Sequence, residues 1–315
     1  MVTLRIGTRG SRLALIQSNW VANRLRALVA ELDVELIEIR TSGDVIRDVP
    51  LGPELGSSFF TKEIEDALLD ERIDVAVHSC KDLATSMPHG LALAAVPLRE
   101  DARDVLVSSG GALSELPAGA TVGTSSPRRK GFLAIASPEL VIVDQRGNVP
   151  TRVAAVDEGR VDAVVLAAAG LARLGMTNRV TEYFRSEVVL PAAAQGALAL
   201  QVRQNDEAWT ELVGTLDDAD SHSAVMAERA CLHRLGAGCQ APVGALARVE
   251  SAVIEIEAAV VTPMGIVRTT ASGTTGDSDG VGTRAAEDLL AAIGLESLRA
   301  ADWAGPPPRD VGAAR

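Results

Sequence analysis

The sequence predicts a mixed α/β protein with three domains, of which the first two share one topology and the third carries an antiparallel sheet. Two observations predict this organisation. Three strand-and-loop motifs occur twice in the chain, in the same order. After residue 218 the pattern changes to consecutive strand candidates joined by turns. At 315 residues the chain is long enough to bury a separate core in each domain.

The duplicated motifs each begin with a short apolar strand. They pair "LRIGTRGSRLAL" (4–15) with "ATVGTSSPRRKG" (120–131), "VELIEIRTSGD" (34–44) with "LVIVDQRGNV" (140–149), and "ERIDVAVHSCKDLA" (71–84) with "GRVDAVVLAAAGLA" (159–172). Between them, "SRLALIQSNWVANRLRALV" and "FTKEIEDALLDER" repeat apolar residues at intervals of three and four, which predicts helices. Thr61 is the expected N-cap of the second helix, which would begin at Lys62. Strands that alternate with helices favour two α/β domains of similar topology.

The last part of the chain has a different pattern. A predicted helix, "SHSAVMAERACLHRL" (221–235), precedes the strand candidates "VGALARVE" (243–250), "AVIEIEAAVVTP" (252–263) and "GIVRTTASGTT" (265–275), and a helix "GTRAAEDLLAAIG" (282–294) follows them. This order indicates an antiparallel meander. Residues 93–104 and 190–203 are candidates for chain crossings between the first two domains. The tail "GPPPRDVGAAR" is expected to be disordered.

Composition excludes several classes of function. A formal net charge of −12 argues against nonspecific binding to nucleic acids or anionic membranes. The sequence has no apolar run near the ~18–20 residues of a membrane span, and the first residues show no signal-peptide pattern, so a cytoplasmic protein is expected. Three cysteines without CxxC spacing indicate free thiols, and the four scattered histidines predict no metal site. No GxSxG or GxxxxGK[ST] motif is present.

Cationic side chains gather in the loops that follow the predicted strands. They are Arg9, Arg12, Lys81, Arg128, Arg129, Lys130, Arg146 and Arg152. Each alone could be a solvated surface charge. Because open α/β sheets bind ligands where strands end and helices begin, "TSSPRRK" and "QRGNVPTR" together favour a site for a small polyanion.

The local sequence leaves the roles of three further residues undecided. Asp82 directly follows a predicted strand (73–78) and stands beside Lys81, which suits an acid, a base or a partner for a cation, but Asp is equally a common helix N-cap. His78 has the same ambiguity. Cys239 lies in "LHRLGAGCQAPVG", a turn of small residues that would let a bulky group reach a thiol, or it is an incidental thiol.

Taken together, these motifs resemble the porphobilinogen deaminase family, also called hydroxymethylbilane synthases. The resemblance is carried in order by "RIGTRGSRLAL", "TSGDVI", "IDVAVHSCKDL", "VGTSSPRR", "RGNVPTR", "LAAAGLARLG", "PAAAQGAL" and "ERACLHRLGAGCQAPVG". It implies two domains like those of periplasmic binding proteins, spanning 1–97 plus 197–216 and 102–192, a smaller α+β domain at 218–303 and a disordered tail at 304–315. It also implies a monomer.

The function implied by the resemblance is tetrapyrrole biosynthesis by a transferase. Such an enzyme condenses four porphobilinogen molecules head to tail on a covalent dipyrromethane cofactor. Each unit loses ammonia, the resulting azafulvenium carbon is attacked by the growing chain, and water finally releases linear hydroxymethylbilane. One carboxylate near the pyrrole nitrogens and many cations near the acetate and propionate arms are then expected.

The resemblance also implies roles for individual residues. Cys239 would carry the cofactor through a thioether, and Asp82 would be catalytic. The cofactor would be bound by Lys81, Asp82, Thr124, Ser126, Arg128, Arg129, Arg146 and Gly147, and the substrate by Arg9, Ser11, Arg152, Arg173, Gln195 and Phe60. One departure lies in "GPELGSSFF" (52–60), where many family members have a glycine-rich stretch with a lysine and this chain has Ser57.

Two other functions explain part of the sequence. A two-domain anion-binding or solute-binding module without catalysis accounts for the duplicated α/β plan and the arginines, but not for Cys239 or the third domain. A phosphoryl-transfer enzyme requires a phosphate loop with a lysine and an acidic metal pair, and the sequence has neither.

Overall fold

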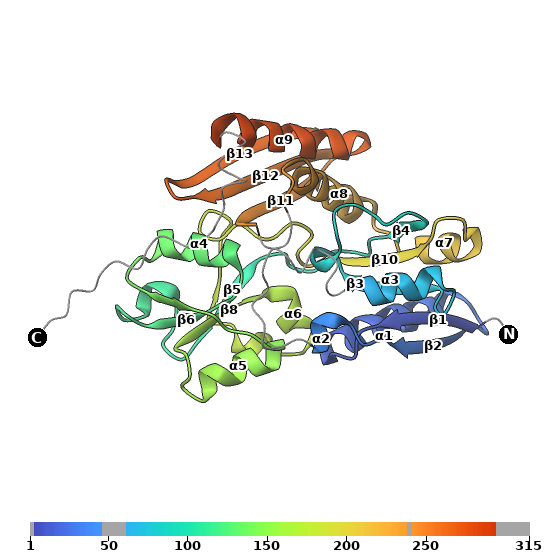
Figure 1. Ribbon diagram of the computed structural model, residues 1–315, viewed down its shortest axis with the longest axis horizontal. Helices are drawn as coiled ribbons and strands as arrows, with labels where there is room; N and C mark the ends of the chain where they lie inside the picture. Colours follow the sequence, from blue (N-terminus) through green and yellow to red (C-terminus); the bar gives the residue numbers. More distant parts are fainter. Residues whose placement is uncertain (1–2, 46–60, 238–240, 294–315) are drawn as a thin grey trace, which may run out of the picture.

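The computed structural model describes residues 3–45, 61–237 and 241–293, which form two α/β domains side by side and a third domain above them (Figure 1). The first sheet has the strand order β2-β1-β3-β10-β4, in which β10 runs antiparallel to its neighbours. Its strands are β1 (Thr3–Thr8), β2 (Asp33–Glu38), β3 (Val75–Ser79), β4 (Leu91–Ala95) and β10 (Leu198–Arg203). The helical elements of this domain are α1 (Arg12–Leu28), α2 (Ser42–Val45), α3 (Lys62–Leu69), the 3-10 turn Cys80–Asp82 and α7 (Glu207–Gly214).

The second sheet has the equivalent order, β7-β6-β8-β5-β9, with β5 antiparallel to its neighbours. Its strands are β5 (Asp104–Ser108), β6 (Thr121–Gly123), β7 (Val141–Val143), β8 (Ala163–Ala167) and β9 (Glu182–Tyr183). The helical elements are α4 (Pro127–Ala136), α5 (Val149–Asp157), α6 (Ala168–Arg173) and the 3-10 turns Leu113–Glu115 and Thr177–Arg179.

The duplication predicted from the sequence is confirmed by these topologies. The three repeated motifs contain β1 and β6, β2 and β7, and β3 and β8, and each pair occupies the same position in its sheet. The antiparallel strand of each sheet is tied to a crossing: β5 begins at the last residue of the first crossing, and β10 forms the last part of the second. The predicted fold class, two α/β domains and a smaller domain with an antiparallel sheet, is therefore confirmed. The residue bounds given for the domains stay a prediction.

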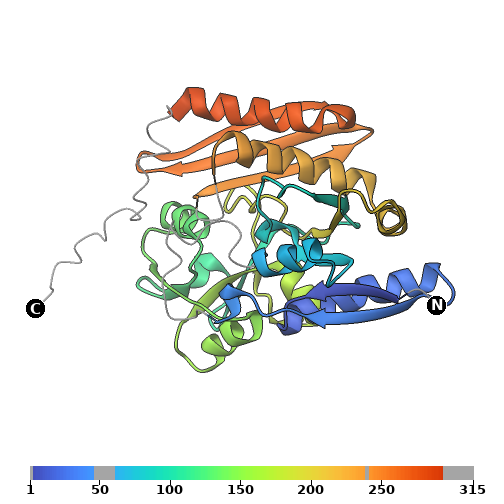
Figure 2. The same cartoon turned by 45° about the vertical axis from the view of Figure 1, so that its right-hand side comes forward.

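The third domain is a meander covered by two helices on one face (Figure 2). Its elements are α8 (Ala219–Arg234), β11 (Val243–Glu250), β12 (Val253–Thr262), β13 (Gly265–Thr274), the 3-10 turn Thr275–Asp277 and α9 (Ser278–Ile293). Side chains alternate along β12, because successive strand residues point to opposite faces. Ile254 and Ile256 pack in the core with the two helices, whereas Ala259 and Val261 pack against the second domain.

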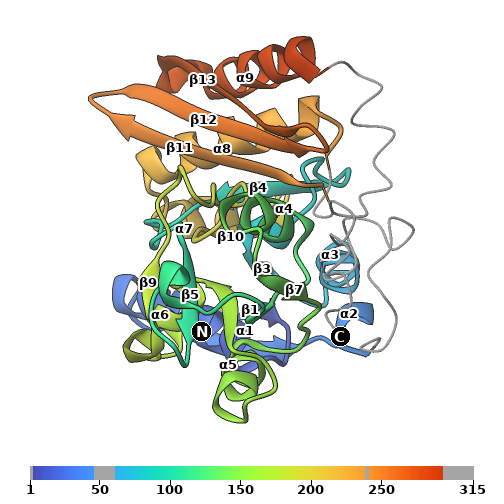
Figure 3. The same cartoon turned by 90° about the vertical axis from the view of Figure 1, so that its left-hand side faces the viewer.

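Contacts with both α/β domains hold the third domain in place. Its sheet lies over α4 of the second domain, and Phe132 of that helix shares a core cluster with Leu246 and Val261 (Figure 3). The carboxylate of Glu228, on α8, is fully buried and pairs with both Nη atoms of Arg99 at 2.6 and 3.0 Å. It also accepts hydrogen bonds from the backbone N–H groups of Ala194 and Ala247. One carboxylate therefore joins both crossings to the third sheet.

Several sequence-based predictions can be compared with the described residues. Thr61 stands at the N-cap of α3, as predicted, but its hydroxyl makes no capping hydrogen bond and lies 3.4 Å from Glu65. Cys80 and Cys231 are free, buried thiols. Within the described ranges, no helix is long and apolar enough to cross a membrane, and no three His, Cys, Asp or Glu side chains are grouped to hold a metal ion. The predictions for Cys239, Ser57, Phe60 and the C-terminal tail lie outside the described residues.

Candidate active site

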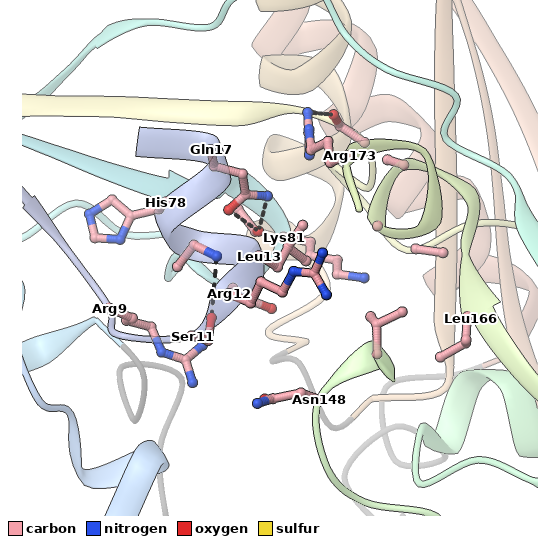
Figure 4. Close-up of a pocket in the computed structure, with 18 of the residues that line it drawn as sticks. Arg9, Ser11, Arg12, Leu13, Gln17, His78, Lys81, Asn148, Leu166 and Arg173 are labelled. Carbon is pink, nitrogen blue, oxygen red and sulfur yellow. Dashed lines mark hydrogen bonds between the residues drawn. The ribbon is translucent and has the colours of Figure 1, made fainter. Parts of the chain in front are cut away.

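A cavity of about 320 Å³ lies between the first two domains, at the carboxyl ends of their parallel strands. Figure 4 shows side chains of both domains pointing into it. Six cationic side chains line it: Arg9, Arg12, Lys81, Arg129, Arg152 and Arg173. Among the described residues that line the cavity, Asp82 is the one acidic side chain. The described lining is therefore strongly electropositive around the carboxylate of Asp82.

The turn between β1 and α1 supplies the first-domain wall. Ser11 is the N-cap of α1, and its Oγ accepts a hydrogen bond from the backbone N–H of Ala14 at 3.2 Å. This cap explains why the helix begins at Arg12. Arg9 and Arg12 flank the cap, and both line the cavity (Figure 4). The partial positive charge at the N-terminus of α1 adds to the positive potential of the arginines.

The 3-10 turn after β3 brings Lys81 and Asp82 to the same cavity. The Nζ atom of Lys81 donates to Oε1 of Gln195 at 3.1 Å. Burial and the positive charge of Arg129 lower the pKa of Lys81 to about 8, while Asp82 and Asp104 oppose that shift. Asp82 is the last residue of the turn and precedes no helix, so the helix-cap interpretation is wrong.

Three arginines of the second domain, Arg129, Arg152 and Arg173, contribute to the opposite wall. Gly147 has a φ of +107°, a conformation that glycine adopts without strain, and its carbonyl accepts a hydrogen bond from Nε of Arg152 at 2.8 Å. Burial lowers the pKa of Arg152 to about 10, as do the neighbouring charges of Arg129 and Arg146, whereas Asp82 raises it. Asp82 therefore faces cations of both domains.

Arg128 and Arg129 both turn toward one buried carboxylate. Both are buried, and both pair at 2.6 Å with the fully buried carboxylate of Asp104, the first residue of β5. Arg128 also donates to the carbonyl of Leu190, and Arg129 to the carbonyl of Val165. Arg129 still contributes to the cavity wall, whereas Arg128 does not.

The structure thus brings together a subset of the residues predicted from the sequence. Arg9, Ser11, Lys81, Asp82, Arg129, Gly147, Arg152 and Arg173 line the cavity. Thr124, Ser126, Arg128, Arg146 and Gln195 are outside the described lining. Thr124 is fully buried, and its Oγ1 accepts from the N–H of Ser126, which is itself the N-cap of α4. Arg146 is half-buried beside Arg152, and Gln195 is buried and accepts a hydrogen bond from Lys81.

Sequence reasoning missed three residues. Gln17 and Asn148 line the cavity, and Gln17 is held by a 3.0 Å hydrogen bond from its Nε2 to Oγ of Ser79. Asp104 is the third. A charged residue at the head of the apolar run "DVLVS" was the available signal, because a buried carboxylate requires cationic partners.

Fold and cavity together define a three-domain α/β protein that carries an electropositive cleft between two sheets of equivalent topology. Residues 4–211 match the family model described as "Porphobilinogen deaminase, dipyromethane cofactor binding domain". Residues 222–291 match "Porphobilinogen deaminase, C-terminal domain". The chain belongs to the porphobilinogen deaminase family, as the sequence motifs predict.

Curated relatives agree along nearly the whole chain. The porphobilinogen deaminase of Syntrophotalea carbinolica is 46% identical over 308 residues, covering 97% of this chain and 98% of the relative. The porphobilinogen deaminase of Desulforudis audaxviator is 48% identical over 288 residues, covering 90% of this chain and 93% of the relative. Among solved structures, the methionine-binding protein MetQ aligns with 68% of this chain and 89% of its own at 12% identity, with a TM-score of 0.44.

Proposed function

We propose that this chain condenses four porphobilinogen molecules head to tail on a covalent dipyrromethane primer and releases linear hydroxymethylbilane. The observation that carries the proposal is the cavity itself, in which Asp82 is surrounded by cationic side chains of both domains. Porphobilinogen and the dipyrromethane both bear acetate and propionate arms, whose carboxylates match guanidinium and ammonium donors. The family assignment supports the same activity.

The donor set fits the cofactor. Lys81, Arg129 and Arg152 would hold its carboxylates, and their partners fix their positions before any ligand arrives: Gln195 for Lys81, Asp104 for Arg129 and the Gly147 carbonyl for Arg152. When bound, the dipyrromethane supplies the free pyrrole carbon to which substrate units are added. The protein's contribution is to hold the acid arms and to orient that carbon.

Asp82 would act on the substrate. Loss of ammonia from porphobilinogen leaves positive charge on the pyrrole, and a carboxylate held within the cavity stabilises that charge and accepts hydrogen bonds from pyrrole N–H groups. Arg9, Ser11 and Arg173 line the cavity near this carboxylate and would bind the acid arms of the incoming molecule. Water attack on the finished chain then releases the product and leaves the primer in place.

Cys239 would carry the primer through a thioether. The residues before it support this assignment, because Gly236 and Ala237 line a second cavity of about 310 Å³ together with Cys80 and Lys81. Lys81 also lines the first cavity, so Gly236 and Ala237 lie beside the turn that carries Lys81 and Asp82. Loss of ammonia from the aminomethyl group of a pyrrole precursor would leave an azafulvenium, and addition of the Cys239 thiolate to its methylene carbon would form the C–S bond and neutralise the cation.

We also propose that the protein acts as a cytoplasmic monomer without nucleic-acid or membrane partners. The net charge of −12 supports this, since nucleic acids and anionic membranes repel an acidic protein. Sedimentation of the purified chain at the mass of a dimer would contradict the monomer.

The decisive test combines mass spectrometry with turnover. The purified chain is expected to exceed its sequence mass by one dipyrromethane and to convert porphobilinogen to hydroxymethylbilane. Cys239→Ser is expected to lose both properties, because a hydroxyl is a far poorer nucleophile than a thiolate. Cys231→Ser, at a buried thiol of α8, is the matched control and is expected to keep both. A chain with no added mass and no product would be a solute-binding module.

A further inference from the structure

A buried carboxylate outside the cavity lining organises the cations around it. Asp104 is 0% exposed. Its Oδ2 accepts from Nη1 of Arg128 at 2.6 Å, and its Oδ1 accepts from Nη2 and Nε of Arg129 at 2.6 and 3.0 Å and from Nε2 of Gln195 at 2.9 Å. Burial would raise the pKa of Asp104, but the two guanidinium groups hold it below its ordinary value. The carboxylate is therefore ionised and saturated with donors.

Strand pairing explains how this carboxylate reaches the active site. Strands β5 and β8 are antiparallel, with Asp104 opposite Ala167, so the start of β5 lies beside the end of β8. Ala167 lines the cavity. Asp104 is consequently one strand away from the cavity wall, at the level where the ligand-binding loops begin.

Asp104 holds Arg129 directly. Two of the guanidinium nitrogens of Arg129 bind Asp104, and the third, Nη1, donates to the carbonyl of Val165 at 2.9 Å. These contacts leave the guanidinium with one orientation. Because Arg129 lines the cavity, the direction in which it presents its remaining donors is set by Asp104.

Asp104 holds Lys81 through Gln195. The amide nitrogen of Gln195 donates to Oδ1 of Asp104 and, at 2.8 Å, to the carbonyl of Ala102. A flipped amide would place its oxygen against two acceptors, so these contacts select one orientation. That orientation points Oε1 at Nζ of Lys81, 3.1 Å away. The position of the lysine ammonium thus depends on a carboxylate that it does not touch.

We propose that Asp104 is a positioning residue of this active site, which fixes Arg129 directly and Lys81 through Gln195, and so sets the geometry of carboxylate binding. The role rests on the proposed function, because the bound carboxylates are those of the cofactor and of porphobilinogen. Asp104 itself touches neither, and its substitution should act on binding more than on the chemical step.

The test compares Asp104→Asn with a matched control. Asp74→Asn removes the charge of another buried aspartate, which pairs with Arg5 at 2.6 Å and Arg203 at 3.3 Å at the start of β3, the opposite end of that strand from Lys81. Both variants are expected to lower Tm. Asp104→Asn alone is expected to reduce the bound dipyrromethane seen by intact mass and to raise KM for porphobilinogen by roughly tenfold or more, with a smaller change in kcat. Equal losses in the two variants at equal Tm would overturn the proposal.

Gln195→Met keeps the test decisive if Asp104→Asn does not fold. It retains the ion pairs of Asp104 with Arg128 and Arg129 and removes the amide that bonds Asp104, Lys81 and the carbonyl of Ala102. A raised KM with a Tm near that of the wild type is expected. Wild-type KM and cofactor content in Gln195→Met would refute the connection to Lys81.

A readout independent of turnover separates this proposal from the proposed function. The chain has three lysines, Lys62, Lys81 and Lys130, so peptide mass resolves the acylation of each by an amine-reactive ester. The rate at which Lys81 is acylated is expected to differ at least severalfold from the wild-type rate in Asp104→Asn and in Gln195→Met. In Asp74→Asn this rate is expected to equal that of the wild type. Unchanged Lys81 rates in both cavity variants would contradict positioning, whereas a wild-type chain that makes no hydroxymethylbilane would contradict only the function.

Discussion

The Nη2 atom of Arg173, at the end of α6, lies 2.8 Å from the carbonyl oxygen of Gly196, in the crossing that leads into β10. The same carbonyl accepts a hydrogen bond from the backbone N–H of Glu100, in the other crossing. A residue of the cavity wall and both connections between the α/β domains therefore meet at one peptide group. This arrangement makes the site sensitive to changes in the crossings.

Gly196→Ala tests how much the close packing of the two crossings at this peptide group contributes to stability. Gly196 has a φ of +90°, and a Cβ atom there would lie 2.3 Å from the carbonyl oxygen of Glu100. We expect the free energy of unfolding to fall by at least about 2 kcal/mol, because backbone strain and a backbone clash add. Gly159→Ala is the control, since its φ of +66° imposes strain but nothing lies within 4 Å of the added Cβ. If urea unfolding shows the same loss of unfolding free energy in both variants, backbone strain alone accounts for the effect and the clash with Glu100 does not contribute.

Asp82→Asn tests the catalytic carboxylate. The substitution keeps the size of the side chain and removes its charge, so turnover is expected to fall roughly a hundredfold or more while cofactor content and Tm stay near wild type. Asp82 precedes no helix, so no capping loss is expected to lower Tm. The measurements are hydroxymethylbilane formation, intact mass and thermal unfolding. A near-normal rate with the cofactor in place would remove Asp82 from the mechanism.

Arg152→Leu and Arg128→Leu separate ligand binding from structure. Arg152 lines the cavity, so its loss is expected to weaken cofactor or substrate binding by about 1.5–3 kcal/mol with little change in Tm. Arg128 is 3% exposed and paired with the buried Asp104, so its loss is expected to lower the free energy of unfolding by about 3 kcal/mol or more. If both variants change only Tm, or only KM, the assignment of the two arginines is wrong.

The burial of His78 predicts that the protein loses stability as the pH falls. Burial lowers its pKa from 6.5 to about 4, although Oε1 of Gln201 lies 3.0 Å from its Nε2. Between these two pH values the unfolded chain binds a proton that the folded chain does not, so His78 makes stability fall as pH drops from 6.5 toward 4. The resulting loss in the free energy of unfolding reaches about 3 kcal/mol at and below pH 4. The measurement is the free energy of unfolding of wild type and His78→Gln at pH 7 and pH 4.5. An identical pH dependence in both proteins would contradict this role.

The sequence by itself determined the duplicated α/β plan, the meander of the third domain and the family. Local signals suffice for these features: strands and helices follow the spacing of apolar residues, and loops between a strand and a helix place Arg9, Lys81 and Arg152 at the ligand-binding edge of each sheet. The ordered motifs also indicated the importance of Asp82, although its local sequence fitted a helix cap equally well.

Only the tertiary structure decided which cations line the cavity and which do not. Arg128 and Arg129 are neighbours in sequence and both pair with Asp104 on β5, yet of the two only Arg129 lines the cavity. The contact between Lys81 and Gln195 likewise joins residues that are 114 positions apart in the sequence. A buried charge takes whichever partner packing brings within reach, and that choice depends on the assembled sheets rather than on residues nearby in sequence.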